Sequence, residues 1–148
     1  MSRPNLLYLH ICDDVRQEIN GKISMMGIYN SSIVVPEIPY SISKLCFYSR
    51  FSGITNKHVF NFSIVNPVGE EAKIIENSVC EPEGDADQGI FNVVASPFQL
   101  NQEGSYEIII NIVELDQEET TNYKYNQKFS VIDLIRIKKD YTDNSQEY

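Results

Sequence analysis

Hydrophobic side chains in this chain recur mostly at every second position, which is the period of a β-strand with one buried face. Phe60, Phe62 and Ile64 alternate in this way with their neighbours. Turn-forming residues separate the runs, and no stretch has the period of a helix longer than about two turns. In chain order, we predict strands at residues 5–12, 22–29, 32–35, 44–51, 59–65, 72–78, 90–100 and 106–115, with one or two more within 123–137.

These strands predict an all-β, single-domain β-sandwich of about eight or nine mostly antiparallel strands, immunoglobulin-like in general architecture. Residues 1–139 form the sandwich in this prediction, and the polar residues 140–148 form a disordered tail. The sequence Gly104-Ser105-Tyr106 resembles the start of a late strand in many immunoglobulin-like sandwiches. In such strands the tyrosine hydroxyl caps a nearby backbone group, and the resemblance supports a sandwich.

The densest polar segment lies between the first two predicted strands, from Cys12 to Tyr29. Its Asn20-Gly21 dipeptide is a strong signal for a tight hairpin turn, because both residues must adopt positive φ. A strict two-residue turn would pair Arg16 with Met25 and set a charge beside apolar side chains on one face. We therefore expect a bulge or a broader loop over residues 13–19.

Charged side chains in this hairpin are the candidate binding residues, namely Asp13, Asp14, Arg16, Glu18 and Lys22. One hypothesis makes them the rim of a binding or catalytic site. The alternative is an ion network that fixes the shape of the hairpin, with Arg16 forking onto a carboxylate. The chain has no glycine-rich phosphate loop and no hydrolase or metalloprotease motif, so we predict a protein that is not an enzyme.

A second candidate site is an acidic loop at residues 80–89. Its carboxylates are candidate ligands for a hard cation such as Ca²⁺, which binds six to eight oxygen atoms. The alternative is a loop whose charges are simply solvated. We predict no cofactor, and the candidate metal ligands are Glu81, Glu83, Asp85 and Asp87.

The charge of the chain is strongly uneven. Its net charge is −9, but residues 66–119 hold 13 of the 21 acidic residues and the single base Lys73. That segment therefore carries −12 and the remainder +3. Nucleic-acid binding relies on basic contacts to phosphate, so a nucleic-acid partner is not expected. The acidic stretch serves solubility, a cation site or electrostatic docking, and these alternatives stay open.

Neither a secretory signal nor a membrane span is evident, so we expect a cytoplasmic protein without membrane contact. Cys12, Cys46 and Cys80 are widely spaced and odd in number, which argues against a disulfide framework and a zinc site. Each is expected to be a small buried apolar residue. The chain also has nine tyrosines, which either belong to the core or line an exposed interface.

These observations favour a binding module that engages a protein partner or forms a homo-oligomer, for example through an uncovered edge strand. The alternative is a sandwich that binds a small ligand or a cation, at the hairpin or at the acidic loop.

Several motifs resemble a family of uncharacterised bacterial and phage proteins, a domain of unknown function. The first is Cys12-Asp13-Asp14-Val15-Arg16 followed by Glu18, Asn20-Gly21-Lys22 and Gly27-Ile28-Tyr29; later ones are Ile33-Val34-Val35-Pro36, Pro39, Lys44-Leu45, Pro67-Val68-Gly69 and Gly104-Ser105-Tyr106. The resemblance spans most of residues 6–115 and implies a β-sandwich, but it assigns no activity. A phage- or host-defence-related antagonist is an alternative role that it suggests.

Overall fold

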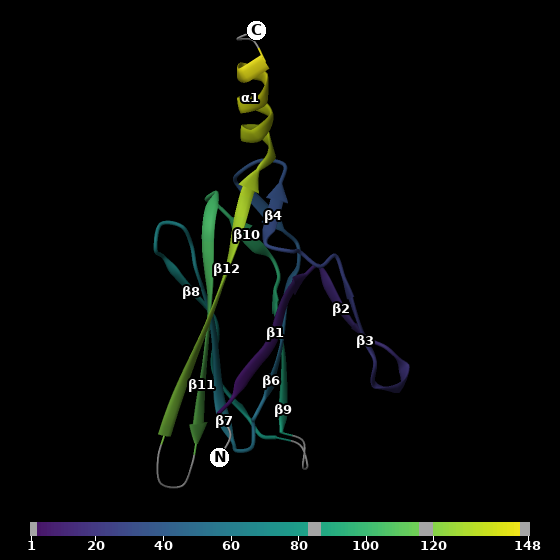
Figure 1. The fold of residues 1–148 in the computed structure, drawn as a ribbon, viewed down its shortest axis with the longest axis vertical. Coiled ribbons are helices and arrows are strands. Elements are labelled where there is room, and N and C mark those ends of the chain that lie inside the picture. The colour runs from purple at the N-terminus through teal and green to yellow at the C-terminus, as the bar shows by residue number, and fades with distance from the viewer. Residues whose placement is uncertain (1–2, 83–86, 116–119, 146–148) are drawn as a thin grey trace.

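Two sheets stacked around a shared core make up the body of the protein. The computed structural model describes residues 3–82, 87–115 and 120–145 (Figure 1). These ranges hold a short 3₁₀ turn at Ile19–Gly21, twelve strands and one α-helix: β1 Asn5–Cys12, β2 Asp14–Gln17, β3 Ile23–Met26, β4 Ser32–Val35, β5 Tyr40–Ile42, β6 Leu45–Ser52, β7 His58–Val65, β8 Glu71–Cys80, β9 Gln88–Ala95, β10 Phe98–Leu100, β11 Gly104–Leu115, β12 Thr120–Asp133 and α1 Leu134–Ser145.

The pairing order separates a three-stranded from a five-stranded sheet. The first has the order β1-β6-β9 and the second β4-β12-β11-β7-β8. All neighbours are antiparallel except β4 and β12. The prediction of an all-β sandwich with mostly antiparallel strands is confirmed. Within the described ranges the strands number twelve instead of eight or nine, because short pairs such as β5–β10 and β2–β3 are counted separately.

Alternating side chains from both sheets fill the core. Phe60, Phe62 and Ile64 on β7 are buried, as their two-residue period predicts. The ring of Phe47 on β6 lies 5.1 Å from the ring of Phe62, which joins the two sheets. Tyr106 donates a hydrogen bond from its hydroxyl to the Gln102 carbonyl oxygen at 2.7 Å, as the tyrosine does in the strands that this segment resembles.

The first strand departs from its predicted pattern at one residue. The two-residue spacing of Leu7, Leu9 and Ile11 predicts that the three side chains share one face of the strand, but Leu7 is 48% exposed. A register irregularity between Leu6 and Tyr8 turns Leu7 outward and places Leu6 against the core. The prediction for Leu7 was therefore wrong, whereas Leu9 and Ile11 are buried as expected.

The C-terminal segment forms a helix where the sequence predicted strand and tail. Helix α1 begins directly after β12 and extends away from the sandwich (Figure 1). The prediction that no helix exceeds about two turns was wrong, as was the extension of strand structure to Ile137. Residues 140–145, assigned by composition to a tail, belong to α1, and 146–148 lie outside the described residues. No helix in the described ranges is long and apolar enough to cross a bilayer.

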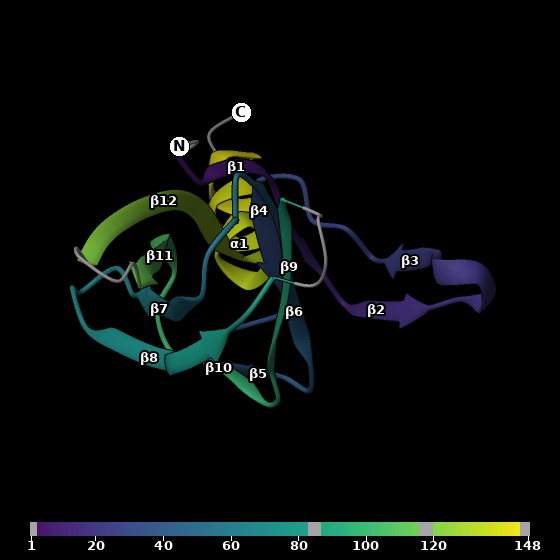
Figure 2. The same ribbon diagram turned by 90° about the horizontal axis from the view of Figure 1, so that it is seen from below.

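The β2–β3 hairpin stands apart from the two sheets. Figure 2 shows it projecting from the side of the three-stranded sheet that faces away from the five-stranded sheet. Its strands pair Arg16 with Ser24 and Gln17 with Ile23. The loop then closes through a hydrogen bond from the Glu18 amide to the Lys22 carbonyl at 2.7 Å. The expected broader loop therefore exists, but it lies at residues 18–22 instead of 13–19.

Candidate functional site

The base of the hairpin is held by Asp13. The Tyr29 hydroxyl donates to Asp13 Oδ1 at 2.7 Å, and the Asp13 amide donates to the Met26 carbonyl at 2.9 Å. Burial, followed by the hydrogen bond to this carboxylate, raises the pKa of Tyr29 to about 12. Gly27, at φ +66°, has no Cβ to occupy the space that the Asp13 carboxylate takes. Asp13 and Gly27 therefore fit only as a pair.

A second carboxylate ties the hairpin to the sandwich. Asp14 Oδ1 accepts a hydrogen bond from Lys44 Nζ at 2.5 Å, and Oδ2 accepts one from Arg16 Nε at 3.1 Å. The hydrogen bond from Lys44, with a smaller contribution from Arg16, holds the pKa of Asp14 below its usual value. Lys44 lies immediately before β6. This geometry fits the hypothesis of an ion network that fixes the hairpin.

The remaining two candidate residues lie elsewhere. Glu18 and Lys22 are exposed at the loop of the hairpin, and within the described ranges neither forms an ion pair. Their neighbour Ile19 is 86% exposed. The structure thus gathers Asp13, Asp14 and Arg16 at the base but separates Glu18 and Lys22 from them. Ile19 lies among the polar residues Glu18, Asn20 and Lys22, and a pattern of charges gives no signal for an exposed apolar side chain.

Two buried thiols lie beneath the hairpin base. Cys12 and Cys46 are fully buried, as predicted, and their thiols donate to the carbonyl oxygens of Asp14 and Asp13. Burial raises the pKa of Cys12 to about 11 and also raises that of Cys46. Neither thiol has the character of a nucleophile at neutral pH, because the thiolate is the reactive form.

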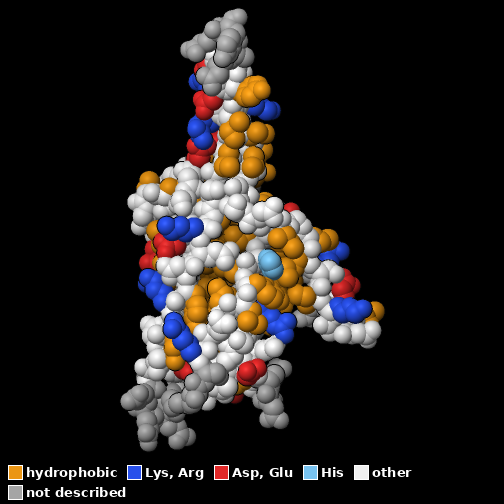
Figure 3. Space-filling model, viewed as in Figure 1, with side chains coloured by type: hydrophobic (Ala, Val, Ile, Leu, Met, Phe, Trp, Pro, Cys, Tyr) orange, Lys and Arg blue, Asp and Glu red, His pale blue; other side chains and the backbone are white. Residues whose placement is uncertain are grey.

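The outer face of the three-stranded sheet is unusually apolar. Its outward positions form three rows across the strands: Cys12–Cys46–Val94, His10–Tyr48–Asn92 and Tyr8–Arg50–Ile90. We call these nine residues the outer face; Cys12, Cys46 and Tyr48 are buried within it, and the other six reach the surface. The rings of Tyr8 and His10 lie 4.9 Å apart, and those of Tyr8 and Tyr48 lie 6.2 Å apart and stacked. Figure 3 shows hydrophobic side chains gathered on the molecular surface over this region.

Arg50 is the single Lys, Arg, Asp or Glu among these nine residues. A chain with a net charge of −9 has thus placed no carboxylate on this face. Ile90 is 55% exposed and Val94 is 43% exposed. Solvated sheet faces usually alternate polar residues outward, so this composition is typical of a covered face.

The acidic loop does not assemble a cation site from the residues that the structure describes. Glu83 and Asp85 lie outside those residues. Glu81 pairs with Lys57 at 3.6 Å, and the Asp87 carbonyl accepts a hydrogen bond from the Ile54 amide at 2.9 Å. No three His, Cys, Asp or Glu side chains in the described ranges converge on a possible ion position. The cation hypothesis therefore stays a sequence-based prediction.

The tyrosines lie in several different parts of the structure. Tyr48 belongs to the outer face, whereas Tyr125 packs its ring against Phe51 in the core and donates its hydroxyl to the Pro4 carbonyl. Tyr123 instead lies under the guanidinium of Arg3, at 5.5 Å from the ring centre. Exposed tyrosines therefore do not form one continuous surface, and the outer face draws on only two of the nine.

The comparisons with known proteins identify a family without an assigned activity. No curated protein and no solved structure matches this chain. A model of a family of unknown function, DUF6941, matches residues 7–126, which include the hairpin, its ion network and the strands of both sheets except the start of β1 and the end of β12. Since that match covers well over half of the sequence, the chain belongs to the DUF6941 family.

Proposed function

We propose that this protein is a non-enzymatic binding module that docks a protein partner on the outer face and the adjoining hairpin. The observation that carries the proposal is the outer face itself. It is aromatic and apolar, and it lacks carboxylates although the chain is acidic. Protein interfaces have this composition at their centre, with aromatic residues and arginine enriched and acidic residues depleted.

The hairpin supplies area that the outer face alone does not have. Three strands of eight residues present roughly 400 Å² at ordinary strand spacing. A stable interface buries about 800 Å² on each partner. The hairpin projects on the same side of the molecule and exposes Ile19, Ile23 and Met26. A partner seated against both surfaces buries more area than a partner on the outer face alone.

Arg50 favours a different protein over a second copy of this chain. It lies on β6, the central strand of the sheet, and its buried Nε has no hydrogen-bond partner among the described residues. A two-fold axis that runs along β6 would bring Arg50 close to its own copy, and like charges at an interface are costly. A partner that presents a carboxylate within an apolar surface pairs with Arg50 instead.

Site-specific photo-crosslinking in extracts of the source organism tests this proposal. A benzophenone side chain at Val94, on the outer face, is expected to give one dominant adduct that Arg50→Glu removes. The same group at Val79, an exposed valine on β8, is the matched control and should give no such adduct. Equal adducts from both positions would contradict the proposal.

Light scattering of the purified protein tests the choice of partner. The expected result is a monomer at every concentration. A mass that doubles with concentration and returns to the monomer in Arg50→Glu would show that a second copy occupies the outer face.

A further inference from the structure

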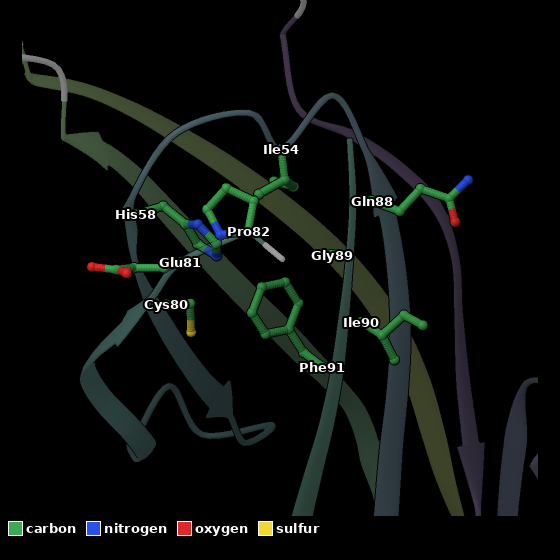
Figure 4. A pocket seen from close by; sticks show the side chains of 9 residues that line it. All are labelled: Ile54, His58, Cys80, Glu81, Pro82, Gln88, Gly89, Ile90 and Phe91. Atoms are coloured by element: carbon green, nitrogen blue, oxygen red, sulfur yellow. The ribbon is translucent and has the colours of Figure 1, made fainter. Parts of the chain in front are cut away.

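A hollow in the surface lies where β7 begins, β8 ends and β9 begins, and no residue of the β2–β3 hairpin lines it. Its volume is about 480 Å³, within the range of pockets that hold small molecules. Apolar side chains form most of the wall, from Ile54, Pro82, Ile90 and Phe91 (Figure 4). The ring of Phe91 stacks on Phe60 with 4.1 Å between centres, so this part of the wall is fixed by the core.

His58 presents an unsatisfied acceptor at this hollow. Its side chain is buried, and Nδ1 lies 3.2 Å from the Asn56 carbonyl oxygen. A carbonyl only accepts, so Nδ1 carries the proton and Nε2 has the free lone pair when the ring is neutral. Burial lowers the pKa of His58, which keeps the ring neutral at pH 7.

Nothing among the described residues satisfies that lone pair. Nε2 is buried without a hydrogen-bond partner, a state that is rare in native proteins and that calls for an explanation. Figure 4 shows the His58 ring directed toward the space between Pro82 and Phe91, and the ring stands edge-on to Phe91 with 5.6 Å between centres. His58 is one of the residues that line the hollow.

The charges near the hollow point away from it. The Glu81 carboxylate is directed outward in Figure 4 and pairs with Lys57. The other polar lining groups are the Gln88 side chain and the half-buried Cys80 thiol. An ionic ligand finds no counter-charge on the described inner wall, whereas a neutral one loses little solvation on entering.

We propose that the hollow binds a small, neutral, planar molecule that donates one N–H or O–H hydrogen bond to His58 Nε2 and packs its ring against Phe91. This site shares Ile90 with the outer face and otherwise consists of different residues, and the proposal does not depend on the protein partner. The hollow should therefore select ligands by whether they carry a hydrogen-bond donor more than by the size of their ring. A ligand without a donor leaves the buried Nε2 acceptor unpaired, which costs free energy.

Phenol and anisole are the matched probes, because both offer the same ring and only phenol has a donor. We expect NMR titration to show phenol binding about fivefold more tightly than anisole, the factor that one neutral hydrogen bond gives. His58→Phe keeps an aromatic ring in place and should remove that preference. Equal affinities in the wild type, or no binding of either probe, would overturn the proposal.

Alkylation of Cys80 supplies a readout that needs no substitution. Cys12 and Cys46 are fully buried, whereas Cys80 is partly exposed and lines the hollow, so iodoacetamide should modify Cys80 first. Saturating phenol is expected to slow this reaction severalfold, and anisole at the same concentration should slow it less. Alkylation that proceeds unchanged in phenol would refute binding in the hollow even if His58→Phe failed to fold.

Discussion

Gly27 and Asp13 show how single residues fix the base of the hairpin. At Gly27 the backbone is at φ +66°, and a Cβ there would lie 2.1 Å from Asp13 Oδ2. Gly21 also has positive φ, at +73°, but a Cβ there would meet no atom within 4 Å. A side chain at Gly21 would meet only an unfavourable backbone conformation, whereas one at Gly27 would also meet the Asp13 carboxylate.

We expect Gly27→Ala to destabilise the hairpin by about 3 kcal/mol, because an unfavourable φ and an overpacked contact add together. Gly21→Ala should cost only about 1 kcal/mol, since only the backbone term applies. Native-state hydrogen exchange of the amides at residues 14–26 measures both losses. Equal losses from the two variants would mean that Asp13 moves aside freely.

Local chemistry of the hairpin was predictable, but its partners were not. Asn20 and Gly21 both have positive φ, as the dipeptide predicts. Lys44, in contrast, reaches Asp14 from 30 positions further along the chain. That contact depends on how β1 pairs with β6, and the pairing of distant strands is not encoded in local spacing. The sequence therefore predicted which charged residues the hairpin contains, but not which of them pair with residues elsewhere in the chain.

Among the secondary-structure elements, helix α1 is held in place by the turn of the sandwich that precedes β11. The Asp133 side chain accepts hydrogen bonds from the amides of Ile135 and Arg136, which caps the first turn of the helix. Glu103, just before β11, accepts from the Asp133 amide at 2.8 Å and pairs with Arg136 at 2.6 Å. The helix is thus attached through Glu103 to a different part of the chain.

Glu103→Gln should loosen α1 without unfolding the sandwich. The hydrogen bond from the Asp133 amide, and then that from Arg136, lowers the pKa of Glu103 below its ordinary 4.5. A lowered folded pKa means that its contribution is complete above about pH 4.5 and is lost as pH falls through the folded value. Protection of the α1 amides should therefore fall in wild type below pH 4.5 and be severalfold lower in Glu103→Gln at pH 7.

Asp140→Asn is the matched control for this prediction. Asp140 is the second and more exposed carboxylate near Arg136, at 3.5 Å and 62% exposed. Exposed pairs one helical turn apart contribute little to stability, so α1 should keep its protection in this variant. If both variants lost protection equally, Glu103 would have no special part in attaching the helix.

Helix α1 was missed because its sequence continues the alternation of the preceding strand. Ile135 and Ile137 stand two positions apart, which favours a strand, and the contacts that fix the helix come from Glu103. Asp133 as a helix cap was the one local signal. By contrast, β11 was predicted almost to its ends, because its buried residues at 106, 108, 110 and 112 give an unambiguous period of two.

On the scale of the whole molecule, the exposed end of the hairpin is separate from what holds the sandwich together. Every residue from 17 to 23 is exposed, and none belongs to the hydrophobic core. The core instead joins the two sheets through contacts such as that between Phe47 and Phe62. Burial of apolar area is the main source of stability, so residues 17–23 contribute little to it.

Replacing residues 17–23 with Asn-Gly tests that separation. Arg16 and Ser24 already pair across the hairpin, so a two-residue turn joins them without a change of register. We expect urea unfolding to show a loss within about 1 kcal/mol, because no buried side chain is removed. The crosslink from Val94 should weaken strongly at the same time, because the partner loses the area that the hairpin adds. A stable sandwich with an undiminished crosslink would restrict docking to the outer face. A large loss of stability would mean instead that the hairpin is needed for folding and is not only a binding surface.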